Sequence, residues 1–181
     1  FREVIEDNGR IFVNNQLHYE DGKYTIDFED FEKKIVDNNV KVFILCNPHN
    51  PVGRVWTKEE LEKMGDICLK HNVVIMDDEI HCDFTYPGFK FTSFMTLDEK
   101  YHNSLVLYTS PSKTFNVAGL QPANIIIKNP ELRAAYRKAN AAAGYSQGSI
   151  MGQVAVKSVY TKGDEWVNEL VEYTTGNMNY M

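Results

Sequence analysis

Apolar and polar positions follow two different periods along the chain. Residues 40–46 and 73–77 have the length of buried strands, and each contains an unbroken apolar run, at residues 42–46 and 73–76. Residues 104–109 and 123–128 predict two more strands around shorter apolar runs, and residues 10–14 predict a further short strand near the start. Between these runs the apolar positions recur at helical spacing. Alternating strands and helices are typical of an α/β domain.

Helix start signals lie where the period changes. Apolar side chains at helical spacing predict a helix over residues 27–37, with Asp27 as its N-cap. Thr57 and Glu60 form a capping box, which predicts a second helix running to about residue 71. Three more helices are expected after the last strand, over residues 131–143, 149–160 and 164–181.

The spacing from the strand at residue 40 to the strand at residue 73 favours a right-handed parallel crossover. We therefore expect a mostly parallel sheet between helices, a three-layer αβα fold. Ligands bind at the carboxyl ends of the strands in such sheets. Polar residues follow three predicted strands at that end: Asn50, then Asp78 with His81, then Lys113. The sequence thus predicts one site at this edge.

Composition narrows the partners and the location that we expect. The 181 residues, 43% of them hydrophobic, can bury one sizeable core. The net charge is −6 and the basic residues are dispersed, so a nucleic-acid partner is not expected. No apolar run approaches the length of a membrane span, and no signal-peptide pattern is present, which predicts a cytoplasmic protein without membrane contact. Cys46, Cys68 and Cys82 lack metal-ligand spacing and are expected to be free thiols, with no metal site.

Two side chains at the predicted site have unusual settings. Lys113 lies in a hydroxyl-bearing turn, Ser-Pro-Ser-Lys-Thr-Phe-Asn, directly after an apolar strand. Lysine forms a Schiff base with an aldehyde cofactor, and neighbouring hydroxyls suit a phosphate. Asp78 follows a buried strand, where an unpartnered carboxylate is costly. It is either a capping or ion-paired residue, or the partner of a protonated ring nitrogen.

Three segments of the chain resemble signatures of fold-type I pyridoxal 5′-phosphate (PLP) enzymes, in the class I/II aminotransferase superfamily. They are Asn-Pro-His-Asn-Pro-Val-Gly at residues 47–53, Asp-Glu-Ile-His at 78–81, and Ser-Pro-Ser-Lys at 110–113. The resemblance covers nearly the whole chain. His81 and the later Ala-Gly-Leu-Gln are most similar to the carbon–sulfur β-lyase branch, which includes cystathionine β-lyases.

The resemblance implies PLP as the cofactor, an amino acid as the substrate and the PLP-transferase type I large domain as the fold. It implies that Lys113 is the covalent anchor and the group that takes the Cα proton. Asp78 would contact the ring nitrogen, because a protonated ring is the electron sink for the carbanion. Asn50 and His81 would lie near the phenolic oxygen, with a turn connector and a structural histidine as the alternatives.

The same resemblance bears on the phosphate and on the extent of the chain. It implies Ser110 and Ser112 as phosphate ligands, with ordinary turn hydroxyls as the alternative, whereas Gln121 stands where relatives have a phosphate-binding arginine. Complete members are much longer, so the chain is expected to be a central fragment. Residues 1–165 would belong to the PLP-binding large domain, and residues 166–181 would begin the helix toward a small domain. A homodimer is implied for the full protein.

We expect an enzyme, a PLP-dependent carbon–sulfur β-lyase that cleaves cystathionine- or cysteine-type amino acids to pyruvate, ammonia and a thiol. An aminotransferase is the alternative, because both reactions begin with removal of the Cα proton. A non-catalytic PLP-fold regulator or binding module is a third hypothesis. A nucleotide-binding domain is disfavoured, because the chain has no glycine-rich phosphate loop.

Overall fold

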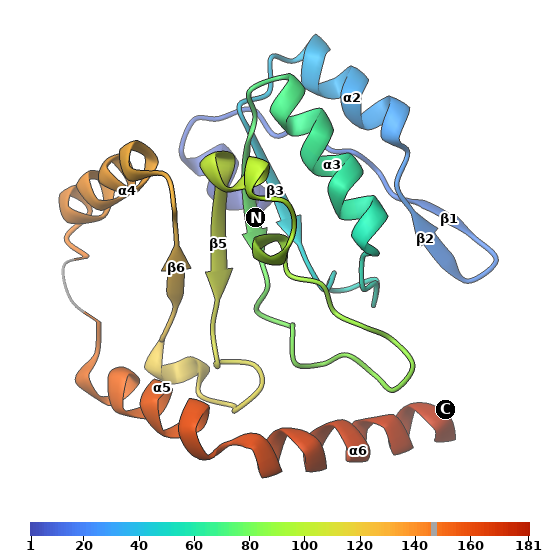
Figure 1. Cartoon of the computed structure of the whole chain (residues 1–181), viewed down its shortest axis with the longest axis vertical. Helices are drawn as coiled ribbons and strands as arrows, with labels where there is room; N and C mark the ends of the chain where they lie inside the picture. The colour runs from blue at the N-terminus through green and yellow to red at the C-terminus, as the bar shows by residue number, and fades with distance from the viewer. Residues whose placement is uncertain (146–147) are drawn as a thin grey trace.

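The structure, a computed structural model, describes residues 1–145 and 148–181. A four-stranded sheet runs through its centre (Figure 1). In spatial order its strands are β3 (Val42–Cys46), β4 (Val74–Asp78), β5 (Leu105–Thr109) and β6 (Asn124–Ile126). The first three strands are parallel and β6 is antiparallel to β5, which confirms the predicted mostly parallel sheet.

Helices surround the sheet, and two further strands form a separate antiparallel hairpin. The remaining elements are α1 (Arg2–Asp7), β1 (His18–Glu20), β2 (Lys23–Thr25), α2 (Phe28–Asp37), α3 (Lys58–Lys70), η1 (Phe94–Thr96), η2 (Glu99–Ser104), η3 (Ala118–Leu120), α4 (Pro130–Ala142), α5 (Ile150–Lys162) and α6 (Asp164–Tyr180).

Both faces of the sheet are covered, which confirms the three-layer arrangement. Met64 and Cys68 of α3 belong to one buried core with Ile75 of β4. Successive strand residues point to opposite faces, so Tyr108 of β5 lies on the other face. Burial, followed by the nearby Tyr136 of α4 and the nearby Asp78, raises the pKa of Tyr108 to about 12. Figure 1 shows α2 and α3 together on one side, with α4 well away from them.

The predicted capping box at the start of α3 is confirmed. The Glu60 backbone N–H donates to Thr57 Oγ1 at 3.2 Å, and the Thr57 N–H donates to Glu60 Oε2 at 2.8 Å. Two otherwise unpaired donors at the helix start are thereby satisfied. The helix then presents its buried face to β4 and η2. This packing fixes the level at which β4 ends, and so the position of the residues that follow it.

The region before α2 differs from expectation. The strand predicted at residues 10–14 is wrong, because that segment pairs with no strand among the described residues and Ile11 is 86% exposed. The pairing occurs later, in the β1–β2 hairpin. Asp21 and Gly22 form its two-residue loop with φ angles of 48° and 78°, the left-handed values that such hairpin loops require.

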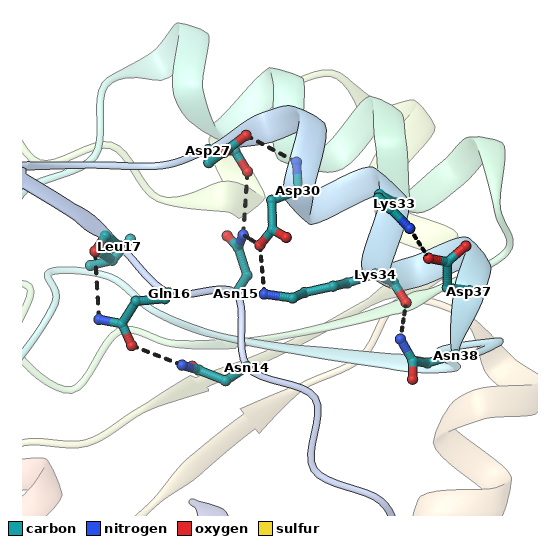
Figure 2. Close-up of polar contacts among 10 residues, drawn as sticks. All are labelled: Asn14, Asn15, Gln16, Leu17, Asp27, Asp30, Lys33, Lys34, Asp37 and Asn38. Carbon is teal, nitrogen blue, oxygen red and sulfur yellow. Dashed lines mark hydrogen bonds and ion pairs between the residues drawn. The ribbon is translucent and has the colours of Figure 1, made fainter.

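The predicted helix cap at Asp27 is confirmed. Asp27 Oδ1 accepts the Asp30 N–H at 2.9 Å, and Asn15 Nδ2 donates to Asp30 Oδ2 at 2.8 Å (Figure 2). Lys34 donates to the same Asp30 oxygen at 2.7 Å. These contacts attach the extended segment before the hairpin to the first turns of α2.

The last two helices cross the end of the molecule to which β5 points (Figure 1). Their predicted positions are confirmed, and α6 has no fully buried side chain. The expected domain boundary between residues 165 and 166 falls inside α6 and stays a prediction. Within residues 1–145 and 148–181, no helix combines the length and the apolar character needed to cross a membrane.

Candidate functional site

Three loops meet at the carboxyl edge of the parallel strands. Cys46, Asp78 and Tyr108 form one row across β3, β4 and β5, so the loops that follow begin at nearly the same level. Backbone hydrogen bonds continue the ladder beyond the strands, from Asn47 N–H to the Asp78 carbonyl and from Glu79 N–H to the Tyr108 carbonyl, both at 2.9 Å. The structure therefore brings the three predicted segments to one edge, as the sequence indicates.

Asp78 is the last residue of β4 and is half-buried. Its Oδ1 accepts the Ile80 backbone N–H at 3.1 Å, which fixes the carboxylate at the start of the loop. Among the residues that the structure describes, no lysine, arginine or histidine forms an ion pair with Asp78. A half-buried carboxylate without a cation is suited to a positively charged ligand group.

Lys113 has a long, exposed side chain, and its neighbours in the turn are buried. Its neighbours Ser112 and Thr114 are 8% and 1% exposed, whereas Lys113 itself is exposed. The Phe115 N–H donates to the Pro111 carbonyl at 2.9 Å, which closes the turn around the lysine. Lys113 also has no ion-pair partner in the described part of the chain. Its amine is thus available to a ligand.

His81 connects the other two residues electrostatically. Burial lowers the pKa of His81, the Asp78 carboxylate opposes that shift, and the Lys113 ammonium adds to it. These three groups therefore lie within electrostatic reach of one another. The net lowering keeps the imidazole neutral over a wider pH range than usual, so it can accept as well as donate a hydrogen bond. Its ring centroid lies 6.2 Å from that of Phe84.

Asn50 lies exposed in the turn that follows β3. The preceding Asn47 is fully buried and donates from Nδ2 to the Thr92 carbonyl at 3.0 Å. Trp56, 2% exposed, donates from Nε1 to the Cys46 carbonyl at 2.9 Å and closes the far end of the turn. The exposed Asn50 amide thus lies in a turn whose two ends are fixed by buried, hydrogen-bonded side chains.

The two serines before the lysine are buried and already hydrogen-bonded to protein atoms. Ser110 Oγ lies 2.7 Å from Ser112 Oγ and donates to the Pro122 carbonyl at 2.5 Å. The Ser112 N–H donates to Ser110 Oγ at 3.1 Å. This arrangement holds the turn shut. Contact of either hydroxyl with a phosphate stays a prediction, and it requires that hydroxyl to give up its present protein partner. Gln121 is exposed and follows η3 with a left-handed backbone conformation.

Sequence reasoning missed a buried acidic pair on the opposite face of β4. Asp77 lies in a row between Leu45 and Leu107 and is 0% exposed, and neither of its carboxyl oxygens has a hydrogen-bond partner among the described residues. Glu79, two residues on and so on the same face, is 3% exposed and accepts the Phe94 N–H at 3.0 Å. The apolar run before Asp77 predicted a buried strand. It did not predict that the next residue, an acid, would be buried as well.

Burial is the largest cause that raises the pKa of Asp77 well above its usual range, and the neighbouring Glu79 raises it further. Burial also raises the pKa of Glu79, but the nearby Ser93 and Asp77 side chains and the Phe94 backbone N–H oppose that shift. Asp77 is therefore the member that keeps its proton, while Glu79 is the better hydrogen-bonded acceptor. Asp78, on the other face, is the acid left for a ligand.

Replacing Asp77 by asparagine should flatten the pH dependence of stability. The folded-state pKa of Asp77 is raised, so its stabilising contribution is complete below about pH 4 and is lost as pH rises through the folded pKa. Each pH unit in that window costs up to about 1.4 kcal/mol of unfolding free energy. Urea unfolding of the complete protein across this pH range measures the slope. Asp7→Asn, at an exposed helix end, should retain it, and an unchanged slope in Asp77→Asn would contradict a protonated Asp77.

No group of three or more histidine, cysteine, aspartate or glutamate side chains is arranged to hold a metal ion within the described ranges. The chemistry that the site offers is thus an amine, a carboxylate, an amide and a neutral imidazole around one strand edge. Such a set can bind an aromatic, protonatable aldehyde and move a proton. That combination is the one predicted from the sequence.

Comparison with protein families identifies one matching family. The model of the aminotransferase class I and II family matches residues 1–181. Cystathionine beta-lyase PatB of Bacillus subtilis is 43% identical over 179 residues, which cover 99% of this chain and 46% of that protein. The chain spans about half the length of the curated relatives that it matches.

Solved structures show the same fold. Cystalysin from Treponema denticola, which contains a pyridoxal 5′-phosphate cofactor, superposes with a TM-score of 0.92 at 40% identity, covering 95% of this chain and 44% of that chain. The PLP-bound C-S lyase from Staphylococcus hominis gives a TM-score of 0.90 at 34% identity, covering 99% of this chain and 45% of that chain.

Proposed function

The chain belongs to the aminotransferase class I and II family, and from that premise we propose that the complete protein is a PLP-dependent carbon–sulfur β-lyase. Its substrates would be cystathionine- or cysteine-type amino acids, which it would cleave with water to pyruvate, ammonia and a thiol. The observation that supports this most is that Lys113 and Asp78, without ion pairs in the part of the chain that the structure describes, follow neighbouring strands at one edge. The chain is also similar to cystathionine beta-lyase and C-S lyase proteins over almost its whole length.

The residues of the strand edge fit PLP by charge and by hydrogen bonding. Asp78 forms no ion pair within residues 1–145 and 148–181 and would face the pyridine nitrogen, where a carboxylate keeps the nitrogen protonated. Lys113 would hold the aldehyde carbon covalently. Asn50 would donate to the phenolic oxygen, and the neutral His81 would lie beside it. When bound, PLP supplies an electron sink for the negative charge that develops at the substrate Cα.

The proton at the substrate Cα would be taken by the Lys113 amine, once the substrate has displaced it from the cofactor. The exposed side chain gives the amine the freedom to move between the two positions, while the buried turn keeps its backbone fixed. With a thiolate leaving group at Cβ, loss of that proton is followed by C–S bond cleavage. The thiolate then takes up a proton and departs as the thiol.

An aminotransferase is the second candidate, because the matching family is described by that activity. After this shared proton removal, the lyase reaction would break the Cβ–S bond, whereas in transamination that bond would stay intact and Lys113 would return the proton to the cofactor. Incubating the complete protein with cystathionine and PLP, without any oxo-acid acceptor, should release pyruvate and a thiol in equal amounts. Product formation that requires an added oxo acid, and that yields an amino acid from it, would overturn the lyase assignment in favour of transamination.

A non-catalytic regulator with this fold would bind PLP without turnover, and the same incubation would then yield no product. The predicted domain boundary in α6, the cytoplasmic location and the homodimer belong to the proposal for the complete protein. Trp166 and Tyr173 of α6 are 52% and 70% exposed, and large exposed aromatic side chains are suited to contact with further protein surface.

A further inference from the structure

The residue directly after Lys113 bridges two of the three loops. The Thr114 hydroxyl donates to Asp83 Oδ2 at 2.7 Å, across 31 residues of sequence. Thr114 is 1% exposed, so its hydroxyl has no access to bulk water and depends on a protein acceptor. Asp83 lies two residues beyond His81, in the loop that begins at Asp78. This bond therefore joins the turn that contains Lys113 to the loop that follows Asp78.

The same turn is fixed from a second side by the last helices. Trp166 of α6 donates from Nε1 to the Thr114 carbonyl at 2.9 Å. A Cβ added to Gly163, between α5 and α6, would come within 2.4 Å of the Phe115 ring, so the ring packs directly on the glycine backbone. The turn around Lys113 is thus held from two distant segments, by Asp83 at the Thr114 hydroxyl and by Trp166 at the Thr114 carbonyl.

We propose that Asp83 is a positioning residue for Lys113, acting through the Thr114 hydroxyl to hold the amine in line with Asp78 and His81. The inference rests on the proposed function, because it concerns the same site. Asp83 touches neither substrate nor cofactor in this role. A misplacement of about 1 Å at a reacting group costs on the order of 10²-fold in rate, so a bond that sets the lysine backbone has a measurable effect.

Thr114→Val removes the donor and keeps the shape of the side chain, and Asp83→Ala removes the acceptor. Each should slow the growth of the visible absorption band when PLP is added to the cofactor-free complete protein, by about tenfold or more. Each should also lower kcat by about 10- to 100-fold with a smaller change in KM. Thr114→Ser keeps a hydroxyl and should restore both rates.

Thr85→Val is the matched control, because Thr85 donates to the Cys82 carbonyl at 3.3 Å within the same loop and, in the described part of the chain, forms no hydrogen bond with the lysine turn. It should leave the band-formation rate and kcat near their wild-type values. If Thr114→Val does not fold, Asp83→Ala tests the same bond from a half-buried residue. The double variant should be no slower than the slower single variant.

Wild-type rates in both Thr114→Val and Asp83→Ala would overturn the positioning role, as would a Thr114→Ser variant that is as slow as Thr114→Val. Either result leaves the proposed function intact, provided that the wild-type protein forms the band and releases pyruvate. Absence of the band in the wild-type protein would instead refute the proposed function. The two failures are therefore distinguishable in one experiment.

Discussion

Replacing Lys113 by alanine in the complete protein should lower kcat for cystathionine cleavage by on the order of 10⁴-fold. The Lys113 side chain is assigned both the covalent attachment of PLP and the transfer of the Cα proton. The three loops at the strand edge contain one further lysine, Lys90. Because the Lys113 side chain is exposed and unpaired within the described residues, its loss should leave the unfolding midpoint unchanged. Steady-state pyruvate release measures the effect.

Two matched variants separate charge from chemistry. Lys113→Arg keeps the positive charge but has no amine that can attack the aldehyde, so it should be about as inactive as the alanine variant. Lys90→Ala removes an exposed lysine from the loop after β4 and should keep near wild-type turnover. Turnover retained in Lys113→Ala would contradict the assignment of Lys113.

Replacing Asp78 by asparagine should lower kcat by on the order of 10²- to 10³-fold while PLP still attaches to the protein. The carboxylate is assigned to the ring nitrogen, and a neutral amide cannot hold that nitrogen protonated as well. Lys113 is unaltered in this variant, so the visible absorption band should remain. The measurement is kcat from pyruvate release, together with the absorption spectrum of the same sample.

Asp77→Asn is the control for that experiment, because it makes the same change one residue earlier, on the opposite face of β4. Since Asp77 is fully buried between two leucine residues, its substitution should change the pH dependence of stability and leave kcat near wild type. Equal kcat values for Asp78→Asn and the wild-type protein would refute the role of Asp78.

Local patterns predicted most of the fold. The apolar runs located β3, β4, β5 and β6, and the capping box located the start of α3, because both signals arise from neighbouring residues alone. The strand expected at residues 10–14 failed because a strand needs a partner, which no local pattern supplies. The hairpin signal was present in Asp21-Gly22, a dipeptide that favours a two-residue hairpin loop.

The site was predictable in part for the same reason. Asn50, Asp78 and Lys113 each follow an apolar strand, and parallel strands bring their carboxyl ends to one edge. The bond between Thr114 and Asp83 was not predictable, because it depends on how two loops fold back over 31 residues. Neither was the burial of Asp77, since an acid beside a second acid more often faces water.

The most direct test is to trap the cofactor on the protein. Borohydride reduction of the complete protein with bound PLP converts the imine to a stable secondary amine, and peptide mass spectrometry then locates the added mass. The predicted result is a modified peptide that contains Lys113, with no such mass in the Lys113→Ala variant. Modification of another lysine with Lys113 unmodified, or no modification in the wild-type protein, would contradict a PLP site built on Lys113.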